Sequence, residues 1–191
     1  VIRGSEQLCF DLIEIPDIVK SVRDKLLEIW FQQYTEIYNI IQPRYQGSTT
    51  WLPVWSPGKY YALQCDFSCM ISTEMFEEFV IPEIIAETEW FDNTIYHLDG
   101  PGAIHHLDSL LKIKKLNAIQ WVPGAGAKPT IEWTGLLKKI LKSGKGMHIT
   151  IPKTDVKTAL KEFQHEGLFI DTTCDSLEEA EELLQLLKRF S

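Results

Sequence analysis

Titratable side chains stand directly after short apolar runs at several points in the sequence. Asp66 follows one such run, and His97 and Asp99 stand two residues apart at the end of a later one. Alternate residues of an extended strand point to the same side, so His97 and Asp99 would share a face. Such a pair could perform acid and base steps or ligate a metal, and it could equally be a structural hydrogen-bonded couple.

A thiol at the end of the last apolar run extends the set of candidates. Cys174 stands there, and with His97 and Asp99 it would offer zinc a sulfur, a nitrogen and an oxygen ligand, provided that the fold brings them together. The catalytic candidates are Asp66 and His97. The metal-ligand candidates are His97, Asp99 and Cys174. The ends of the other apolar runs also carry polar side chains, namely Gln120, His148, Thr172 and Thr173.

Other polar features have simpler explanations. Asp66 could merely hydrogen-bond the amides of a turn. His105 and His106 are adjacent in an expected helix and face different directions, which favours surface or capping roles. The glycine-rich residues 123–127 match neither a P-loop nor a dinucleotide-binding fingerprint, which favours a plain turn over an anion cradle. The acidic cluster within residues 178–182 is typical of a solvated helix start.

The first third of the chain predicts one long helix and a loop. Apolar residues recur with a period near 3.6 from Asp17 to Gln42, which predicts a helix that begins through Pro16 and turns one face to the core. The apolar positions are Ile18, Val22, Leu26, Ile29, Trp30, Ile37 and Ile41. Residues 43–59 carry Gly, Pro and Ser with Trp51 and Trp55, which predicts a loop held by aromatic burial.

From residue 60 onward, apolar runs alternate with amphipathic helical patterns. The predicted strands are 60–65, 94–98, 118–121, 148–151 and 168–170, and the predicted helices are 73–90, 103–112, 134–142, 155–164 and 177–190. Pro82 should kink the first of these helices, and Ser176 with Glu179 forms a capping box for the last. The alternation predicts an α/β fold with a parallel sheet, either open and doubly wound or closed as a (β/α) barrel.

Composition and charge set the broad class. A chain of 191 residues with 45% hydrophobic and 24% charged residues is typical of one globular domain. Its net charge of -8 repels phosphate and anionic lipid, which argues against nucleic-acid and membrane partners. The sequence shows no signal-peptide pattern and no apolar run of about 18 residues, so we expect a cytoplasmic protein. The four cysteines lack a CxxC pair, which favours free thiols.

Three stretches carry a family resemblance. They are residues 63–82, whose most specific part runs from Met70-Ile71-Ser72 to Phe79-Val80-Ile81-Pro82, then His97-Leu98-Asp99-Gly100, and then residues 116–121. Together they resemble the uroporphyrinogen decarboxylase superfamily, which contains the decarboxylase of haem synthesis and cobamide-dependent methyltransferases. The resemblance covers nearly the whole chain and implies a (β/α)8 barrel.

The superfamily domain is nearly twice this length, and the chain resembles its C-terminal part. We therefore expect residues 1–191 to form a single domain, an incomplete parallel (β/α) TIM-type barrel with a helix and loop over 1–58 and five βα units over 59–191. Five units cannot close an eight-stranded ring, which predicts a homo-oligomer or association with the missing barrel half. By itself, the chain is expected to be inactive.

Two chemistries compete within the superfamily. The methyltransferase branch implies a zinc site in which a thiol takes a methyl group from a corrinoid. His97 and Cys174 match the first and last zinc positions, and Asp99 stands where the middle cysteine would be. The decarboxylase branch implies a uroporphyrinogen-like carboxylated substrate without a cofactor. We favour methyl transfer because of Cys174, with a small-molecule substrate and a corrinoid protein as partners. The alternatives are decarboxylation and a noncatalytic binding or structural fragment.

Overall fold

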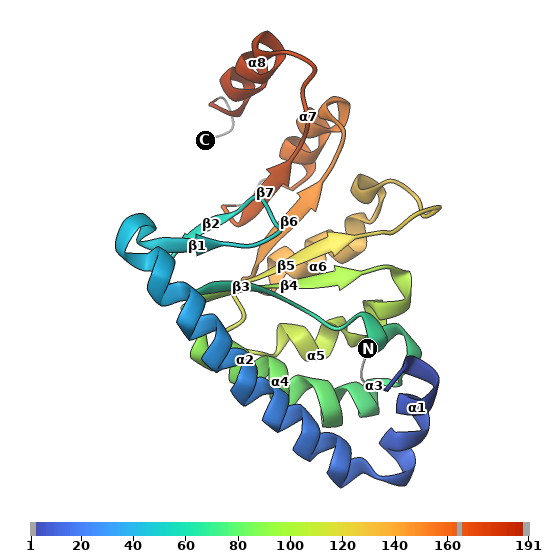
Figure 1. Cartoon of the computed structure of the whole chain (residues 1–191). Coiled ribbons are helices and arrows are strands. Elements are labelled where there is room, and N and C mark those ends of the chain that lie inside the picture. The colour runs from blue at the N-terminus through green and yellow to red at the C-terminus, as the bar shows by residue number, and fades with distance from the viewer. Residues whose placement is uncertain (1–2, 164–165, 189–191) are drawn as a thin grey trace. The chain divides into compact units, whose positions relative to one another are not determined.

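The computed structural model of the chain is an α/β fold with a five-stranded parallel sheet flanked by helices (Figure 1). It describes residues 3–163 and 166–188. The strands are β3 (Tyr60–Gln64), β4 (Asn93–Asp99), β5 (Ala118–Val122), β6 (Gly146–Thr150) and β7 (Leu168–Asp171). Their order in the sheet follows their order in the chain, as in part of an α/β barrel. The five predicted strands are therefore confirmed.

The chain divides into two compact units, and each is described by itself. The first unit contains Val1–Thr94 and Gly102–Leu116, and the second contains Ile95–Pro101 and Asn117–Ser191. Asp66 thus belongs to the first unit, whereas His97, Asp99 and Cys174 belong to the second. In the parts of the chain that the structure describes, no helix is long and apolar enough to cross a membrane.

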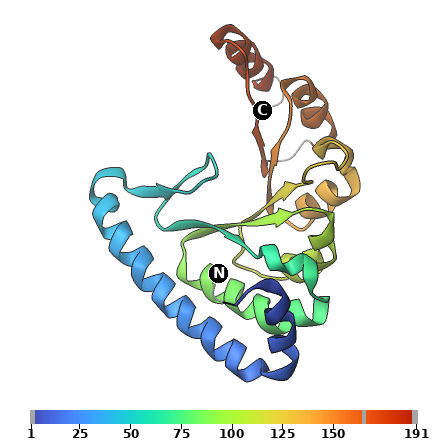
Figure 2. The ribbon, with the colours of Figure 1, turned by 45° about the vertical axis from the view of Figure 1, so that its right-hand side comes forward.

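Helices dominate the first unit. They are α1 (Ser5–Glu14), α2 (Pro16–Tyr45), η1 (Asp66–Met70), α3 (Thr73–Met75), η2 (Phe76–Val80), α4 (Ile81–Trp90), η3 (Pro101–His106, nearly all in this unit) and α5 (Leu107–Leu111). The predicted long helix is confirmed as α2, which begins at Pro16. It runs alongside α4 (Figure 1), and α1 folds back against its start (Figure 2).

The face of α2 that packs inward differs from the predicted one. Its buried side is aromatic: Tyr34 is nearly inaccessible, and its ring lies 4.8 Å from that of Phe91. Trp30 packs edge-on against Tyr61 on the same side, at 4.7 Å between ring centroids. The predicted core positions Ile18, Val22, Leu26, Ile29 and Ile37 are exposed. Apolar residues occupy two adjacent faces of α2, and periodicity alone could not tell which face is covered.

The predicted loop after α2 is a short hairpin, and its tryptophans are exposed rather than buried against the core. Strands β1 (Gly47–Thr49) and β2 (Trp55–Pro57) pair antiparallel. Trp51 is 53% and Trp55 60% exposed, so the predicted aromatic burial is wrong. Ser48 holds the hairpin instead, because its buried hydroxyl accepts from the Tyr60 amide at 2.9 Å and contacts the Tyr34 hydroxyl at 3.1 Å.

Pro82 interrupts the predicted helix 73–90 rather than only bending it. A single α-helical turn (α3) is followed by the π-helical stretch η2, and regular α-helix resumes in α4 with Pro82 in its first turn. Proline has no N–H and clashes with the preceding turn, so the helix widens before it. The predicted helix 103–112 likewise begins as the 3-10 helix η3 before α5.

The second unit is a layered βα structure. Strands β4 to β7 pair in parallel register, and α6 (Thr134–Lys142), α7 (Lys153–Glu162) and α8 (Leu177–Leu187) follow β5, β6 and β7. Leu98, Trp121 and Ile149 are adjacent in register and almost fully buried. This apolar row shows that one face of the unit's sheet is a packed core. The glycine-rich residues 123–127 form a turn, as expected.

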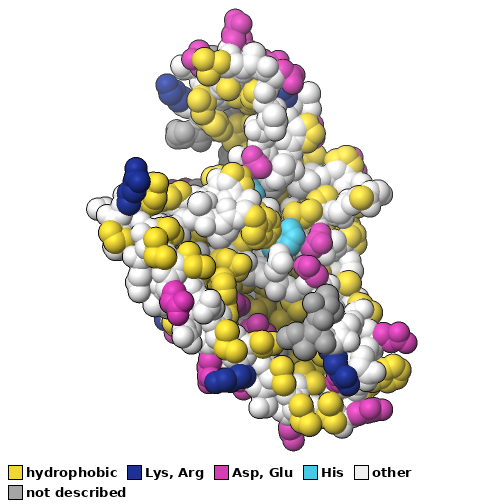
Figure 3. Space-filling view, viewed as in Figure 1, with side chains coloured by type: hydrophobic (Ala, Val, Ile, Leu, Met, Phe, Trp, Pro, Cys, Tyr) yellow, Lys and Arg dark blue, Asp and Glu magenta, His cyan; other side chains and the backbone are white. Residues whose placement is uncertain are grey.

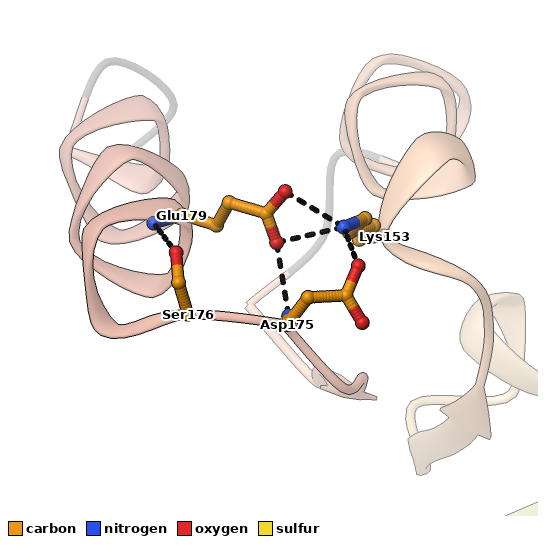
Figure 4. Close-up of polar contacts among 4 residues, drawn as sticks. All are labelled: Lys153, Asp175, Ser176 and Glu179. Carbon is orange, nitrogen blue, oxygen red and sulfur yellow. Dashed lines mark hydrogen bonds and ion pairs between the residues drawn. The ribbon is translucent and has the colours of Figure 1, made fainter.

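The start of α8 confirms Ser176 as its cap, but Glu179 bonds the residue before Ser176 rather than closing the predicted box. The Ser176 hydroxyl accepts from the Glu179 amide at 3.2 Å, while Glu179 accepts from the Asp175 amide at 2.9 Å (Figure 4). Lys153, from the start of α7, donates to Asp175 at 2.5 Å and to Glu179 at 2.7 Å. The expected purely solvated role is therefore wrong for Glu179, which ties α8 to α7.

Candidate functional site

A row of polar side chains crosses three neighbouring strands of the second unit. The register pairs His97 of β4 with Gln120 of β5, and Gln120 with His148 of β6. Residues in register on adjacent parallel strands project to the same side, so these three lie on the face opposite the apolar row. This polar row is the candidate site, because a buried face rarely carries polar groups without a reason.

His97 and Gln120 are joined directly. The His97 Nδ1 atom lies 2.5 Å from Gln120 Oε1, and Gln120 is only 4% exposed. With the amide oxygen as acceptor, Nδ1 must carry the proton. Gln120 therefore fixes both the tautomer and the orientation of the His97 ring.

His148 extends the row into a buried environment. It is 1% exposed, and neither ring nitrogen has a hydrogen-bond partner among the described residues. Burial lowers the pKa of His148; Asp171 raises it to a lesser extent, and His97 lowers it further. The ring is held edge-on against Phe169, at 5.0 Å between centroids. The result is a neutral imidazole that keeps one donor and one acceptor available.

Carboxylates lie at the carboxyl ends of β4 and β7. Asp99 ends β4 and is exposed. Asp171 ends β7 and accepts a hydrogen bond from Thr150 at 3.4 Å. Asp99 lies two residues beyond His97 on β4, and Asp171 is in register with Thr150, which lies two residues beyond His148 on β6. Both carboxylates therefore stand at the carboxyl edge of the sheet, where parallel α/β folds bind ligands.

Asp66, the other catalytic candidate, lies in the first unit. It begins η1 immediately after β3 and is exposed. The Ser72 hydroxyl caps the following helix by accepting from the Met75 amide, so Asp66 has no capping role there. Its prediction as a catalytic residue stays a prediction.

The zinc ligands predicted from the sequence are not assembled into a site. His97, Asp99 and Cys174 belong to one unit, and Cys174 is a half-buried free thiol. Across residues 3–163 and 166–188, however, no three His, Cys, Asp or Glu side chains gather in a way that could hold a metal ion. Their prediction as zinc ligands stays a prediction.

The histidine pair of the first unit has an unexpected place. His106 is 1% exposed, stacks on Phe76 at 4.1 Å, and its Nε2 lies 2.8 Å from the Ser68 carbonyl. The expected surface role is therefore wrong for His106, whereas His105 is half-buried with its Nε2 3.2 Å from the Ile71 carbonyl. Both rings brace η1 against η3.

Strand register explains why the sequence alone did not predict that the three residues of the polar row lie together. Gln120 and His148 could be picked out as polar groups near strand ends, but β6 begins at Gly146, two residues before the predicted start. His148 therefore sits within the strand, beside Gln120. The available signal was one polar residue in each of three successive apolar runs.

No protein-family model, no curated protein and no solved structure matches the chain.

Proposed function

We propose that the polar row is the acid–base centre of a cytoplasmic (β/α)-barrel enzyme that decarboxylates a carboxylated small molecule. The sequence resemblance to the uroporphyrinogen decarboxylase superfamily supplies the substrate class, a uroporphyrinogen-like molecule. The observation that supports the chemistry is one row in which Gln120 lies between His97, which it orients, and the buried His148, whose ring nitrogens have no partner among the described residues.

Decarboxylation needs a proton donor beside the reacting carbon. The bond to the carboxylate breaks, CO2 leaves, and the electron pair stays on the carbon until a proton arrives. His97 in its protonated form would give this proton from Nε2, since Nδ1 is engaged by Gln120, and water would restore it. His148 would stay neutral within the row, because burial disfavours its charged form, which leaves His97 as the residue that gives the proton.

The test is an assay of the purified chain with chemically reduced uroporphyrinogen, in which products are separated by their number of carboxyl groups. His97→Asn keeps an amide group near Nδ1 but has no titratable nitrogen, so turnover should fall about 100-fold or more. His105→Asn is the matched control and should keep native turnover. Native turnover by His97→Asn would refute the proposal, and a self-associated chain without turnover would favour a noncatalytic binding role.

Thiol-directed methyl transfer from a corrinoid is the second candidate. The observation in its favour is the free, half-buried Cys174 in the same unit as His97 and Asp99. We expect less than stoichiometric zinc in the purified chain, measured by inductively coupled plasma mass spectrometry, because the donors are not gathered. Stoichiometric zinc that is lost in Cys174→Ala would instead support methyl transfer and displace decarboxylation.

Self-association is part of the same proposal, through the exposed stripe of α2. The stripe consists of Ile18, Val22, Leu26, Ile29, Ile37 and Ile40, each 45–79% exposed. Hydrophobic side chains reach the surface over α1 and α2 in the space-filling view (Figure 3). Such a stripe offers roughly 500 Å² per chain, so two copies would bury about 1,000 Å², the lower limit for a specific interface.

Light scattering after size exclusion tests this association. The native chain should have the mass of a dimer, and Ile29→Glu should be monomeric because a charge would be buried in the interface. Thr35→Glu places the same charge on the polar side of α2 and should remain dimeric. A monomeric native chain would show that no second copy covers the stripe.

A further inference from the structure

A cavity of about 320 Å³ lies within the first unit, between α2, β3 and α4. Trp30 lines it from α2, Tyr61 from β3, and Glu83 and Glu87 from α4, with Trp51 contributed by the hairpin segment. This volume is in the range of small-molecule pockets, which combine apolar walls with a few polar groups. The cavity thus has the size and the lining of a ligand site.

The acidic pair in the cavity is buried together. Glu83 and Glu87 are four residues apart on α4 and so share one face of the helix, and Glu87 is only 9% exposed. Burial raises the pKa of Glu87 to about 8, and the neighbouring Glu83 raises it further, while a hydrogen bond from Trp30 acts against the shift. Burial also raises the pKa of Glu83. Two adjacent carboxyl groups without a cation resist ionisation.

The cations of the unit do not neutralise Glu87. Arg23 of α2 lowers the pKa of Glu83, and Asp24 beside it raises that pKa. The Arg23 guanidinium is already engaged, because it donates to the Phe79 carbonyl at 3.0 Å and to Asp24 at 2.6 Å. Among the described residues, no lysine or arginine lowers the pKa of Glu87. Among the described residues, the negative charge that Glu87 could carry therefore lacks a counterion, whereas that of Glu83 is only partly offset by Arg23.

Aromatic rings form one part of the cavity wall. The rings of Trp30 and Tyr61 meet at 61° with their centroids 4.7 Å apart, and Trp51 adds a third aromatic side chain. Aromatic faces attract cations, and Trp does so most strongly. An aromatic wall beside paired carboxyl groups is complementary to a cation that also carries an apolar body.

We propose that this cavity binds a small organic ammonium ion, with Glu87 and Glu83 as counterions and Trp30, Tyr61 and Trp51 as the aromatic wall. A metal ion suits the site less well, because no three His, Cys, Asp or Glu side chains gather to hold one in the described parts of the chain. The nearby Cys65 has a pKa raised to about 12, mainly by burial, and stays a neutral thiol. The site belongs to the first unit and does not depend on the proposed decarboxylation.

Ammonium binding should release protons. At pH 7 the free Glu87 carboxyl is protonated, and a bound cation favours its ionised form, so each binding event should expel up to one proton. The affinity for a permanently charged ligand should therefore rise with pH up to about 8 and level off above it.

Isothermal titration of the full chain with choline tests the site, with its neutral isostere 3,3-dimethyl-1-butanol as the ligand control. We expect saturable choline binding at pH 8.5, at least 10-fold weaker binding of the isostere, and proton release at pH 7 when buffers of different ionisation enthalpy are compared. Glu87→Gln should weaken choline binding at least 10-fold at pH 8.5. Glu89→Gln, an exposed substitution on the same helix, should leave it unchanged.

Folding controls distinguish a lost binding site from an unfolded variant. Circular dichroism confirms that each variant is folded, and Glu83→Gln serves as a second test of the pair if Glu87→Gln does not fold. Absence of choline binding, equal binding of the neutral isostere, or native affinity in both carboxamide variants would overturn the assignment.

Discussion

Glu87 in the first unit and His148 in the second are both almost fully buried, yet burial moves their pKa values in opposite directions. The physical cause is the same, since a low-dielectric environment disfavours the charged form of either group. A carboxyl group becomes neutral by keeping a proton, and an imidazole becomes neutral by losing one. Glu87 thus keeps a proton that a bound cation would release, whereas His148 stays a neutral imidazole.

The two sites also differ in how the chain builds them. Glu83 and Glu87 lie on one face of α4 because helical geometry places residues i and i+4 together. The polar row needs three strands in the right register, and a shift of one residue in any of them would move its side chain to the apolar face. Local geometry makes the acidic pair robust, whereas tertiary packing must hold the histidine row.

The largest expected effect comes from breaking that packing. Ile149 is fully buried beside the row on the apolar face of β6. Ile149→Ala should reduce the free energy of unfolding by about 2–5 kcal/mol through lost burial and a cavity. Leu177→Ala, at a position 76% exposed, should change it by less than about 0.5 kcal/mol. Urea denaturation monitored by circular dichroism measures both, and equal effects would contradict a packed core under the row.

The next effect concerns how Glu87 makes the free energy of unfolding depend on pH. The folded state keeps a proton on Glu87 up to about pH 8, whereas the unfolded chain loses it near pH 4.5. Stability from this group is therefore fully present below about pH 4.5 and is lost as the pH rises to about 8. Glu87→Gln should remove this decline. At pH 8.5 its free energy of unfolding should exceed that of the native chain by about 2 kcal/mol.

Denaturant unfolding between pH 5 and 9 measures that difference. Glu89→Gln, with an exposed carboxylate paired to Lys115, should follow the native pH dependence. Parallel curves for the native chain and Glu87→Gln would show that the carboxyl is not buried in a neutral form.

A smaller effect of opposite sign is expected from His148. Its pKa is lowered by burial, so between that value and the ordinary value of 6.5 the unfolded chain binds more protons. Stability from this group is present above about pH 6.5 and is lost as the pH falls. His148→Asn should flatten the pH dependence of the unfolding free energy on the acid side. His105→Asn is the matched control, and a native profile for His148→Asn in the same unfolding series would contradict a neutral buried imidazole.

Much of the secondary structure was predictable from local patterns. The five strands, the long helix α2 and the capped helix α8 follow from periodicity and from short-range signals such as Ser176 three residues before Glu179. Local patterns were less informative near Pro82, where a π-helical stretch replaced a simple kink. They also placed the start of β6 two residues late, which concealed the position of His148.

The sequence by itself determined the alternation of strands and helices, the polar groups near strand ends and the i, i+4 spacing of Glu83 and Glu87, because these depend only on neighbours along the chain. Only the tertiary structure decided that His97 meets Gln120, that the aromatic face of α2 is the buried one, and which carboxyl groups are desolvated. Register, burial and pKa depend on residues that are distant in sequence, so no local pattern could specify them.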